Sequence, residues 1–220
     1  MGVRENLQAV AKAYAHFKDC FSLDKDTDTL KKELFCRIEK ELGEHEVVFD
    51  YIWGKDTLNI DGVSKNRYPE IGDTVIIDIS VGKNGEWCDV CRTFFVGEPT
   101  KEMVSAFNLI EKSLRAGHNA LKPSVKANEV YGEVNGVFSK ENKRLVHHAG
   151  HRIGQEPLMQ PQFVEGNGSP IEKGFYYTIE SGLYDGFGIR LENDFLINEN
   201  GAEDLFEELM PLKIEEYILK

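Results

Sequence analysis

The sequence predicts one α+β domain, in which a curved antiparallel sheet is covered by helices. Three observations support this class: two pairs of segments with helical periodicity, two strand–turn–strand segments, and acidic residues placed inside otherwise apolar strands. The chain has 220 residues and is 41% hydrophobic, which is enough for a substantial core. We therefore expect residues 1–220 to form a single domain.

The first part of the chain predicts two helices and a strand. Residues 2–19 carry apolar side chains at helical spacing. The polar segment Asp24–Thr29 offers caps for a second helix, which ends at Gly43. Val47–Trp53 is expected to be a strand, and the polar, irregular segment Lys55–Tyr68 follows it.

A β-hairpin is predicted next, with strands Thr74–Ser80 and Glu86–Val96 and a turn within GKNG. Two registers fit this turn. A turn centred on Lys-Asn places Asp78 opposite Asp89, whereas a turn centred on Asn-Gly places Asp78 opposite Cys91. The sequence leaves both registers open.

The second part of the chain repeats this order of elements. Helices are expected at Thr100–Leu121 and at Asn128–Phe138, and a second hairpin is expected from the strands Phe175–Tyr184 and Gly188–Ile197. A proline-containing loop, Pro157–Pro170, is expected before this hairpin. The order helix, helix, hairpin in both parts points to an internal duplication.

Four acidic residues interrupt the apolar strands of the two hairpins, namely Asp78, Asp89, Glu180 and Glu192. If Gly186 is the centre of the second turn, Glu180 lies directly opposite Glu192. Like charges placed opposite each other destabilise a sheet, so the arrangement requires a reason. Acids at solvated strand ends are one explanation, and a shared site for cations is the other.

The segment LVHHAGHRIGQE, residues 145–156, contains three of the six histidines, His147, His148 and His151. Gly150 precedes the last of them, and a glycine lets backbone or ligand come close. Four carboxylates and one neutral histidine are balanced by two divalent cations, and such a site suits Mn²⁺, Co²⁺, Fe²⁺ or Zn²⁺. Two such ions bridge a hydroxide and polarise a carbonyl, which predicts metal-assisted hydrolysis.

The composition disfavours several other classes. A formal net charge of −12 disfavours nucleic acid and anionic membranes as partners, and no apolar run has the length of a transmembrane helix. The N-terminus lacks the apolar core of a signal peptide. The lone CxxC of Cys88 and Cys91 has no second ligand pair at zinc-site spacing, so we expect reduced cysteines and a cytoplasmic location.

Five motifs occur in one order between Gly72 and Asp194: GDTVIIDIS, CDVCRTFFVGEPT, GHRIG, YYTIESGLY and GIRLEND. Together they resemble the M24 metallopeptidases, a family that includes methionine aminopeptidase, aminopeptidase P and prolidase. The motifs RTFFVGEPT and GIRLEND are closer to the prolidase and aminopeptidase P branch. The resemblance implies the pita-bread fold with pseudo-twofold halves, and the chain has the length of the catalytic domain alone.

The resemblance also implies which residues bind two metal ions, namely Asp78, Asp89, His151, Glu180 and Glu192. Asp89 and Glu192 would bridge the two ions. Asp78 would hold one ion, and His151 with Glu180 would hold the other. Glu180 would also help to activate the attacking water. The expected ions are Mn²⁺ or Co²⁺, with Zn²⁺ or Fe²⁺ as alternatives.

Four further residues have expected roles near these motifs. Arg190 would orient a metal-binding carboxylate. Arg152 would recognise a substrate carboxylate or form a salt bridge at the rim of the site. His147 is expected directly behind the ligands, whereas His148 is expected to be solvated or used in packing.

Two departures from the family pattern concern substrate binding. The prolidase branch carries one histidine before the first hairpin and another shortly after the GHxxG-like motif, and both contact the substrate. Here Asp61 lies about where the first would be, and Gln155 or Leu158 takes the place of the second. These departures count against ordinary cleavage of Xaa-Pro peptides and leave metal binding intact.

We therefore expect a dinuclear-metal-dependent hydrolase of the Xaa-Pro dipeptidase or aminopeptidase type, acting on a small peptide or peptide-like amide. One alternative is a binding module on the same fold that has lost catalysis. Another is a methionine aminopeptidase-like enzyme. No nucleic-acid or membrane partner is expected, and a homodimer is left open.

Overall fold

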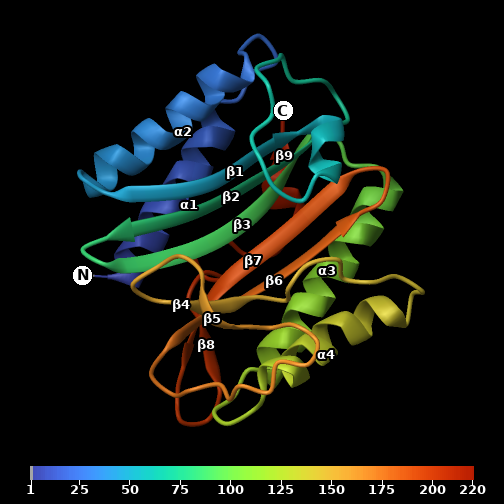
Figure 1. The fold of residues 1–220 in the computed structure, drawn as a ribbon. Coiled ribbons are helices and arrows are strands. Elements are labelled where there is room, and N and C mark those ends of the chain that lie inside the picture. The colour runs from blue at the N-terminus through green and yellow to red at the C-terminus, as the bar shows by residue number, and fades with distance from the viewer. Residues whose placement is uncertain (1) are drawn as a thin grey trace.

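The computed structural model describes residues 2–220 and shows one sheet with a helix pair beside each of its halves (Figure 1). The helices are α1 (Val3–Cys20), α2 (Thr27–Leu42), α3 (Lys101–Ala120) and α4 (Ala127–Ser139). The strands are β1 (Glu46–Trp53), β2 (Thr74–Lys83), β3 (Glu86–Val96), β4 (His151–Ile153), β5 (Met159–Gln162), β6 (Tyr176–Tyr184), β7 (Gly188–Ile197), β8 (Ala202–Asp204) and β9 (Ile218–Leu219). None of the helices in the described part of the chain is long and apolar enough to cross a membrane.

Each half of the sheet has a hairpin next to the middle and one or more further strands at its outer edge. The order is β1-β2-β3-β7-β6-β4-β5, so the two predicted hairpins, β2–β3 and β6–β7, meet side by side at its centre. Cys91 of β3 pairs with Glu192 of β7 at this junction. Each hairpin is preceded in the chain by two helices, which agrees with the duplication predicted from the sequence.

The strands of both hairpins alternate between two faces of the sheet. Val75, Ile77 and Ile79 of β2 belong to the main hydrophobic core beneath the helices. Tyr14 of α1 extends from this core to the carbonyl oxygens of Ile77 and Val90, at 3.0 and 2.9 Å. Polar residues such as Asp78 occupy the alternate positions, so their side chains emerge on the face away from the helices.

The second helix pair lies equally close to its half of the sheet. A Cβ at Gly117 of α3 would lie 2.7 Å from Val134 of α4 and 2.9 Å from Ile179 of β6. Gly117 therefore allows α3 to approach both neighbours at once. This contact holds β6 and its polar face in position.

The register of the first hairpin is the second of the two alternatives. Asp78 pairs with Cys91, and Ser80 pairs with Asp89. The turn is centred on Asn84 and Gly85, whose φ angles are 55° and 75°. A two-residue turn with two positive φ angles favours Asn-Gly, which explains why this register wins. Because the two registers differ by two residues, Asp78 and Asp89 share a face in both.

Most predicted elements agree with the structure to within a few residues. Asp26 caps α2 by accepting a hydrogen bond from the Thr29 amide at 2.8 Å, and Gly43 ends the helix with a φ of 69°. The predicted loop Pro157–Pro170 is wrong in part, because it contains strand β5. This strand is short and pairs with β4 at the edge of the sheet, where a proline is tolerated.

Gly150 fixes the path of the backbone just before His151. Its φ is 128°, and an added Cβ would lie 2.2 Å from the carbonyl oxygen of Thr178. We expect Gly150→Ala to lower the free energy of unfolding by at least about 1–3 kcal/mol, because the backbone conformation alone is that unfavourable for a residue with a Cβ. Chemical denaturation followed by circular dichroism measures this.

Gly132 is the matched control for this substitution. It lies in α4 with open space around it, so Gly132→Ala should raise stability by about 0.5–1 kcal/mol. A Gly150→Ala protein as stable as the parent would show that β4 can move away from Thr178 without loss.

Candidate functional site

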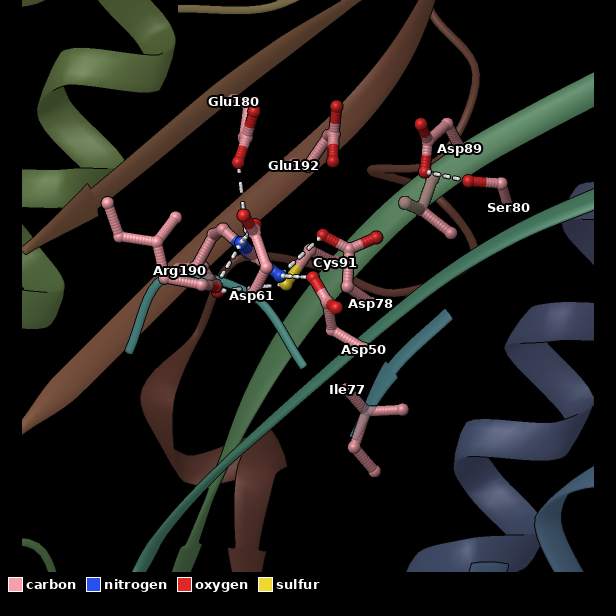
Figure 2. A network of polar contacts seen from close by, with 12 residues as sticks. Asp50, Asp61, Ile77, Asp78, Ser80, Asp89, Cys91, Glu180, Arg190 and Glu192 are labelled. Carbon is pink, nitrogen blue, oxygen red and sulfur yellow. Dashed lines mark hydrogen bonds and ion pairs between the residues drawn. The ribbon is translucent and has the colours of Figure 1, made fainter. Parts of the chain in front are cut away.

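A small cavity opens on the sheet face away from the helices, at the junction of the two hairpins. Its volume is about 270 Å³. Figure 2 shows that Asp50 of β1, Asp78 of β2 and Glu180 of β6 point toward Arg190 of β7. The lining residues are Val48, Phe49, Asp50, Asp61, Asp78, Ser80, Asp89, His148, His151, Leu158, Glu180, Arg190 and Glu192.

All five residues expected to bind metal meet in this cavity, and their ligand atoms form two groups. In the first group, Nε2 of His151 lies 3.4 Å from Oδ2 of Asp89 and 3.8 Å from Oε1 of Glu192. In the second group, Asp78, Glu180 and Glu192 bring carboxylate oxygens within 4.8 Å of one another. Glu192 belongs to both groups. Glu180 shares the second group with Asp78 and Glu192; that it would hold one ion with His151, as the resemblance implies, stays a prediction.

Neighbouring residues hold the first group in place. Ser80 donates a hydrogen bond to Oδ1 of Asp89 at 2.8 Å, and the Asp89 amide donates to Asp194 at 3.1 Å. The His151 amide donates to Thr178 Oγ1 at 3.1 Å. These contacts come from the strands on either side, so the positions of the ligands depend on the pairing of the sheet.

The donor atoms fit divalent cations. Nδ1 of His151 lies 3.0 Å from the carbonyl oxygen of Arg152 and donates to it, which leaves the lone pair of Nε2 facing Asp89 and Glu192. Oε1 of Glu192 is buried and has no hydrogen-bond partner within residues 2–220. A lone pair and unpaired carboxylate oxygens directed at one another require a cation or a proton between them.

Arg190 provides the positive charge of the second group. Its guanidinium is 2% exposed and lies 2.9 Å from Oδ2 of Asp78 and 2.7 Å from Oδ2 of Asp50. It also donates to the carbonyl oxygen of Ile60 at 2.8 Å. Asp61 is 3.7 Å from Arg190, but its side chain is 82% exposed, so Asp61 lies at the rim of the cavity.

Two residues expected near the substrate lie elsewhere. The guanidinium of Arg152 lies 3.7 Å above the ring of Phe175 and does not line the cavity, because successive residues of β4 point to opposite faces. Gln155 is exposed and does not line the cavity. Leu158, the other residue considered for this position, lines the cavity. An apolar side chain therefore borders the site there.

His148 belongs to the site, contrary to the expectation of a solvated or packing residue. Its Nδ1 lies 3.1 Å from Oε2 of Glu180, and it lines the cavity. His147 lies on the other side, with Nδ1 at 3.7 Å from Oε1 of Glu180, and is more deeply buried. Glu180 is therefore placed between two imidazoles and Arg190.

The sequence interpretation also missed Asp50. The signal was present, because Asp50 interrupts the apolar strand β1 just as the four recognised acids interrupt theirs. The role of His148 had no comparable signal. Which of the two neighbouring histidines, His147 or His148, faces the cavity depends on the course of the backbone just before β4. The sequence does not reveal that course.

Burial and mutual repulsion change the acidity of the site. Burial raises the pKa of Asp78 and Glu192 well above the usual range of carboxyl groups, and Asp89 adds to both effects, while Arg190 partly opposes it at Asp78. Burial also opposes the charge of Glu180, but His147, His148 and Arg190 hold its pKa at about 2. Burial lowers the pKa of the His148 imidazole. Burial opposes the charge of His151, but the hydrogen bond to Asp89 and its negative charge, together with the Arg152 carbonyl and Glu180, raise the pKa on balance.

The cavity thus gathers four carboxylates and a histidine, which are the ligand types of a metal site, at the junction of the two halves of the sheet. The family model described as metallopeptidase family M24 matches residues 2–199. The chain belongs to this family, whose peptidases depend on metal ions.

Relatives with similar sequences carry peptidase names. The chain is 28% identical over 201 residues to an uncharacterized peptidase of Methanocaldococcus jannaschii, a match that covers 81% of this chain and 56% of the relative. It is 27% identical over 184 residues to the Xaa-Pro dipeptidase of Pyrococcus furiosus, covering 80% of this chain and 53% of that protein. The chain thus spans little more than half the length of these relatives.

Solved structures confirm the fold. The dipeptidase PepE of Mycobacterium ulcerans superposes with a TM-score of 0.87 at 23% identity, covering 93% of this chain and 56% of the other. The prolidase of Pyrococcus furiosus gives 0.87 at 22% identity, covering 93% and 62%. The protein therefore has the predicted pita-bread fold.

We expect the metal-free protein to lose stability as the pH rises. Asp78, Glu192 and Asp194 have raised pKa values in the folded state, so their contribution to stability is complete below about pH 4 and is lost as the pH rises through the folded values. His151, also raised, acts in the same direction. Two groups act oppositely: Glu180 as the pH falls from 4.5 toward about 2, and His148, whose pKa is lowered by burial, as the pH falls below about 6.5, where it partly offsets the carboxyl groups and His151.

Thermal unfolding with a chelator present should therefore give a lower Tm at about pH 7.5 than at about pH 5.5. With excess Mn²⁺ the order should reverse, because metal binding requires deprotonated ligands. A metal-free protein that becomes steadily more stable toward neutral pH would contradict the acidities assigned to this site.

Proposed function

We propose that the protein is a dinuclear-metal-dependent peptidase of the Xaa-Pro dipeptidase or aminopeptidase type. The observation that carries this proposal is the pair of ligand groups that share Glu192 within one small cavity. A protein used only for interactions has no need to bury four carboxylates together, since that arrangement destabilises the fold unless cations bind.

One ion would be held by Asp89, His151 and Glu192, and the other by Asp78, Glu180 and Glu192. Two divalent ions balance four carboxylates, and oxygen-rich ligands with one imidazole suit Mn²⁺ or Co²⁺ ahead of Zn²⁺ or Fe²⁺. Bound there, the two ions supply Lewis-acid catalysis and a hydroxide nucleophile at neutral pH.

Glu180 and His148 are the groups of this chain that are placed to move a proton. Glu180 is ionised, and His148 is a neutral imidazole whose Nδ1 lies 3.1 Å away on the cavity wall. Glu180 accepts a proton from the attacking water, and His148 carries a proton between Glu180 and the leaving group. His147 lies behind Glu180 and keeps its carboxylate in place.

The substrate proposed is a small peptide or peptide-like amide. The cavity of about 270 Å³ has room for little more than the residues around one peptide bond. Leu158 and the exposed Asp61 border it where the prolidase branch has histidines, so we propose slow turnover of plain Xaa-Pro dipeptides. Leu158 is also the observation that favours the second candidate, a metal-binding protein of this fold without catalysis.

The proposal treats residues 1–220 as one catalytic domain. The net charge of −12 and the four free cysteines agree with a cytoplasmic peptidase that binds neither nucleic acid nor membranes. A homodimer is compatible with this domain.

Metal binding is tested first. Because Glu192 belongs to both ligand groups, Glu192→Gln should reduce the metal content from two ions per chain to less than one, as measured by calorimetric titration with Mn²⁺ and by elemental analysis. The control is Glu199→Gln, which removes an exposed glutamate. This variant should keep two ions. Full two-ion binding by Glu192→Gln would remove the basis of the proposal.

Catalysis is tested with a panel of dipeptides under Mn²⁺, Co²⁺ and Zn²⁺. Glu180→Gln should abolish hydrolysis, and His148→Asn should lower kcat by about 10²–10⁴-fold, the range for one acid–base group. His45→Asn, which changes a partly exposed histidine that does not line the cavity, should have no effect. A wild-type protein that binds two ions and cleaves no member of the panel would favour the non-catalytic candidate.

A further inference from the structure

A second group of metal-ligand side chains lies between α1 and α2, on the helix side of the sheet. His16 and Cys20 come from α1, and Glu33 comes from α2. The sulfur of Cys20 lies 3.4 Å from Nε2 of His16, and this nitrogen lies 3.6 Å from Oε2 of Glu33. All three residues are partly exposed, so an ion can reach them from solvent.

The spacing of these residues suits a shared ligand. His16 and Cys20 are four residues apart, which places them on one face of α1. Cys20 is also the last residue of α1, where the unpaired carbonyl groups of a helix favour a cation. Glu33 meets this face because α2 packs antiparallel against α1 across a short connection (Figure 1).

We propose that His16, Cys20 and Glu33 bind one borderline divalent cation such as Zn²⁺ or Co²⁺, with water as the fourth ligand. Zinc bonds of about 2.0–2.3 Å at tetrahedral angles separate neighbouring ligand atoms by about 3.4–3.6 Å. The two distances in the cluster, 3.4 and 3.6 Å, match this separation without a change of backbone.

When the cation binds, it replaces one proton. The Cys20 thiol loses its proton to solvent as the sulfur binds the cation, and no group is oxidised or reduced. A thiolate, a carboxylate and a divalent cation then sum to zero charge. The bound ion links the end of α1 to the second turn of α2, so it stabilises the helix pair and takes no part in hydrolysis at the cavity.

Lys25 is the natural competitor of the ion. Its ammonium lies 2.8 Å from Oε1 of Glu33 and 2.9 Å from the carbonyl oxygen of Cys20. It uses the other oxygen of the carboxylate, so Oε2 still faces His16. A cation is thus already stabilised at this position, and the flexible, partly exposed Lys25 side chain can move into solvent when a divalent ion binds.

The alternative of a reactive cysteine is less well supported. Burial and the neighbouring Glu33 raise the pKa of the Cys20 thiol, whereas reactive cysteines have lowered pKa values. Among the described residues, no second cysteine belongs to the group of ligand atoms within 4.8 Å of one another; Cys36 is exposed on α2, and Cys88 and Cys91 are buried in the sheet.

The test is a titration of the full chain with Co²⁺, followed by absorbance in the near ultraviolet. Thiolate bonded to Co²⁺ gives an intense charge-transfer band, which carboxylate and imidazole ligands do not give, so the proposed active site is silent in this region. We expect the band to saturate at one ion per chain and to disappear in Cys20→Ser. Cys36→Ser is the matched control and should keep it.

Two further variants complete the test. His16→Ala should weaken the Co²⁺ affinity of this site by more than about tenfold, as expected for loss of a ligand. Lys25→Met should tighten it, because the competing ammonium is gone. Circular dichroism confirms that each variant is folded. A band that is absent from the wild type, persists in Cys20→Ser, or weakens in Lys25→Met would overturn the proposal. The absorbance band reports the bond between the Cys20 thiolate and the ion, and it does not depend on hydrolysis. Failure of this proposal therefore leaves the proposed peptidase function untouched.

Discussion

The burial of four carboxylates beside His148, His151 and the Arg190 guanidinium is the constraint on which the rest of this structure depends. Burying charges of the same sign is unfavourable, and this raises the pKa values of Asp78 and Glu192 well above their usual range. Only Arg190 offsets the charge permanently, through its contacts with Asp78 and Asp50. The remaining repulsion is the physical reason why we propose that the cavity binds cations.

The duplicated sheet holds these charges against their repulsion. Each half contributes one hairpin, and each hairpin contributes two acids on the face away from the helices. The opposite face of the same strands is apolar and packs beneath α1 and α3. Since adjacent residues of a strand point to opposite faces, the strength of the core and the geometry of the site are two consequences of one alternating pattern.

The surroundings of Glu180 distinguish this site from a simple metal-binding cluster. Two imidazoles and Arg190 keep its carboxylate ionised at every physiological pH, although burial opposes this. His148 contributes from the cavity wall and His147 from behind. Glu180 is ionised, whereas the neighbouring Asp78 and Glu192 tend to hold protons. Acid–base catalysis depends on such a difference in acidity.

The sequence by itself determined the two hairpins, the helix pairs, the alternation of faces and the five residues that we propose as metal ligands. Each of these follows from local periodicity or from motifs that keep their order. The hairpin register, the strand β5, the inclusion of Asp50 and His148, and the exclusion of Arg152 and Gln155 were decided only by the tertiary structure. A register depends on which turn the backbone adopts, and the direction of a side chain near a strand end depends on the partner strand. The turn follows a local preference of Asn84-Gly85, but the direction of such a side chain is not a local property, so residues that touch across the junction of the two halves could be found only once the halves were joined.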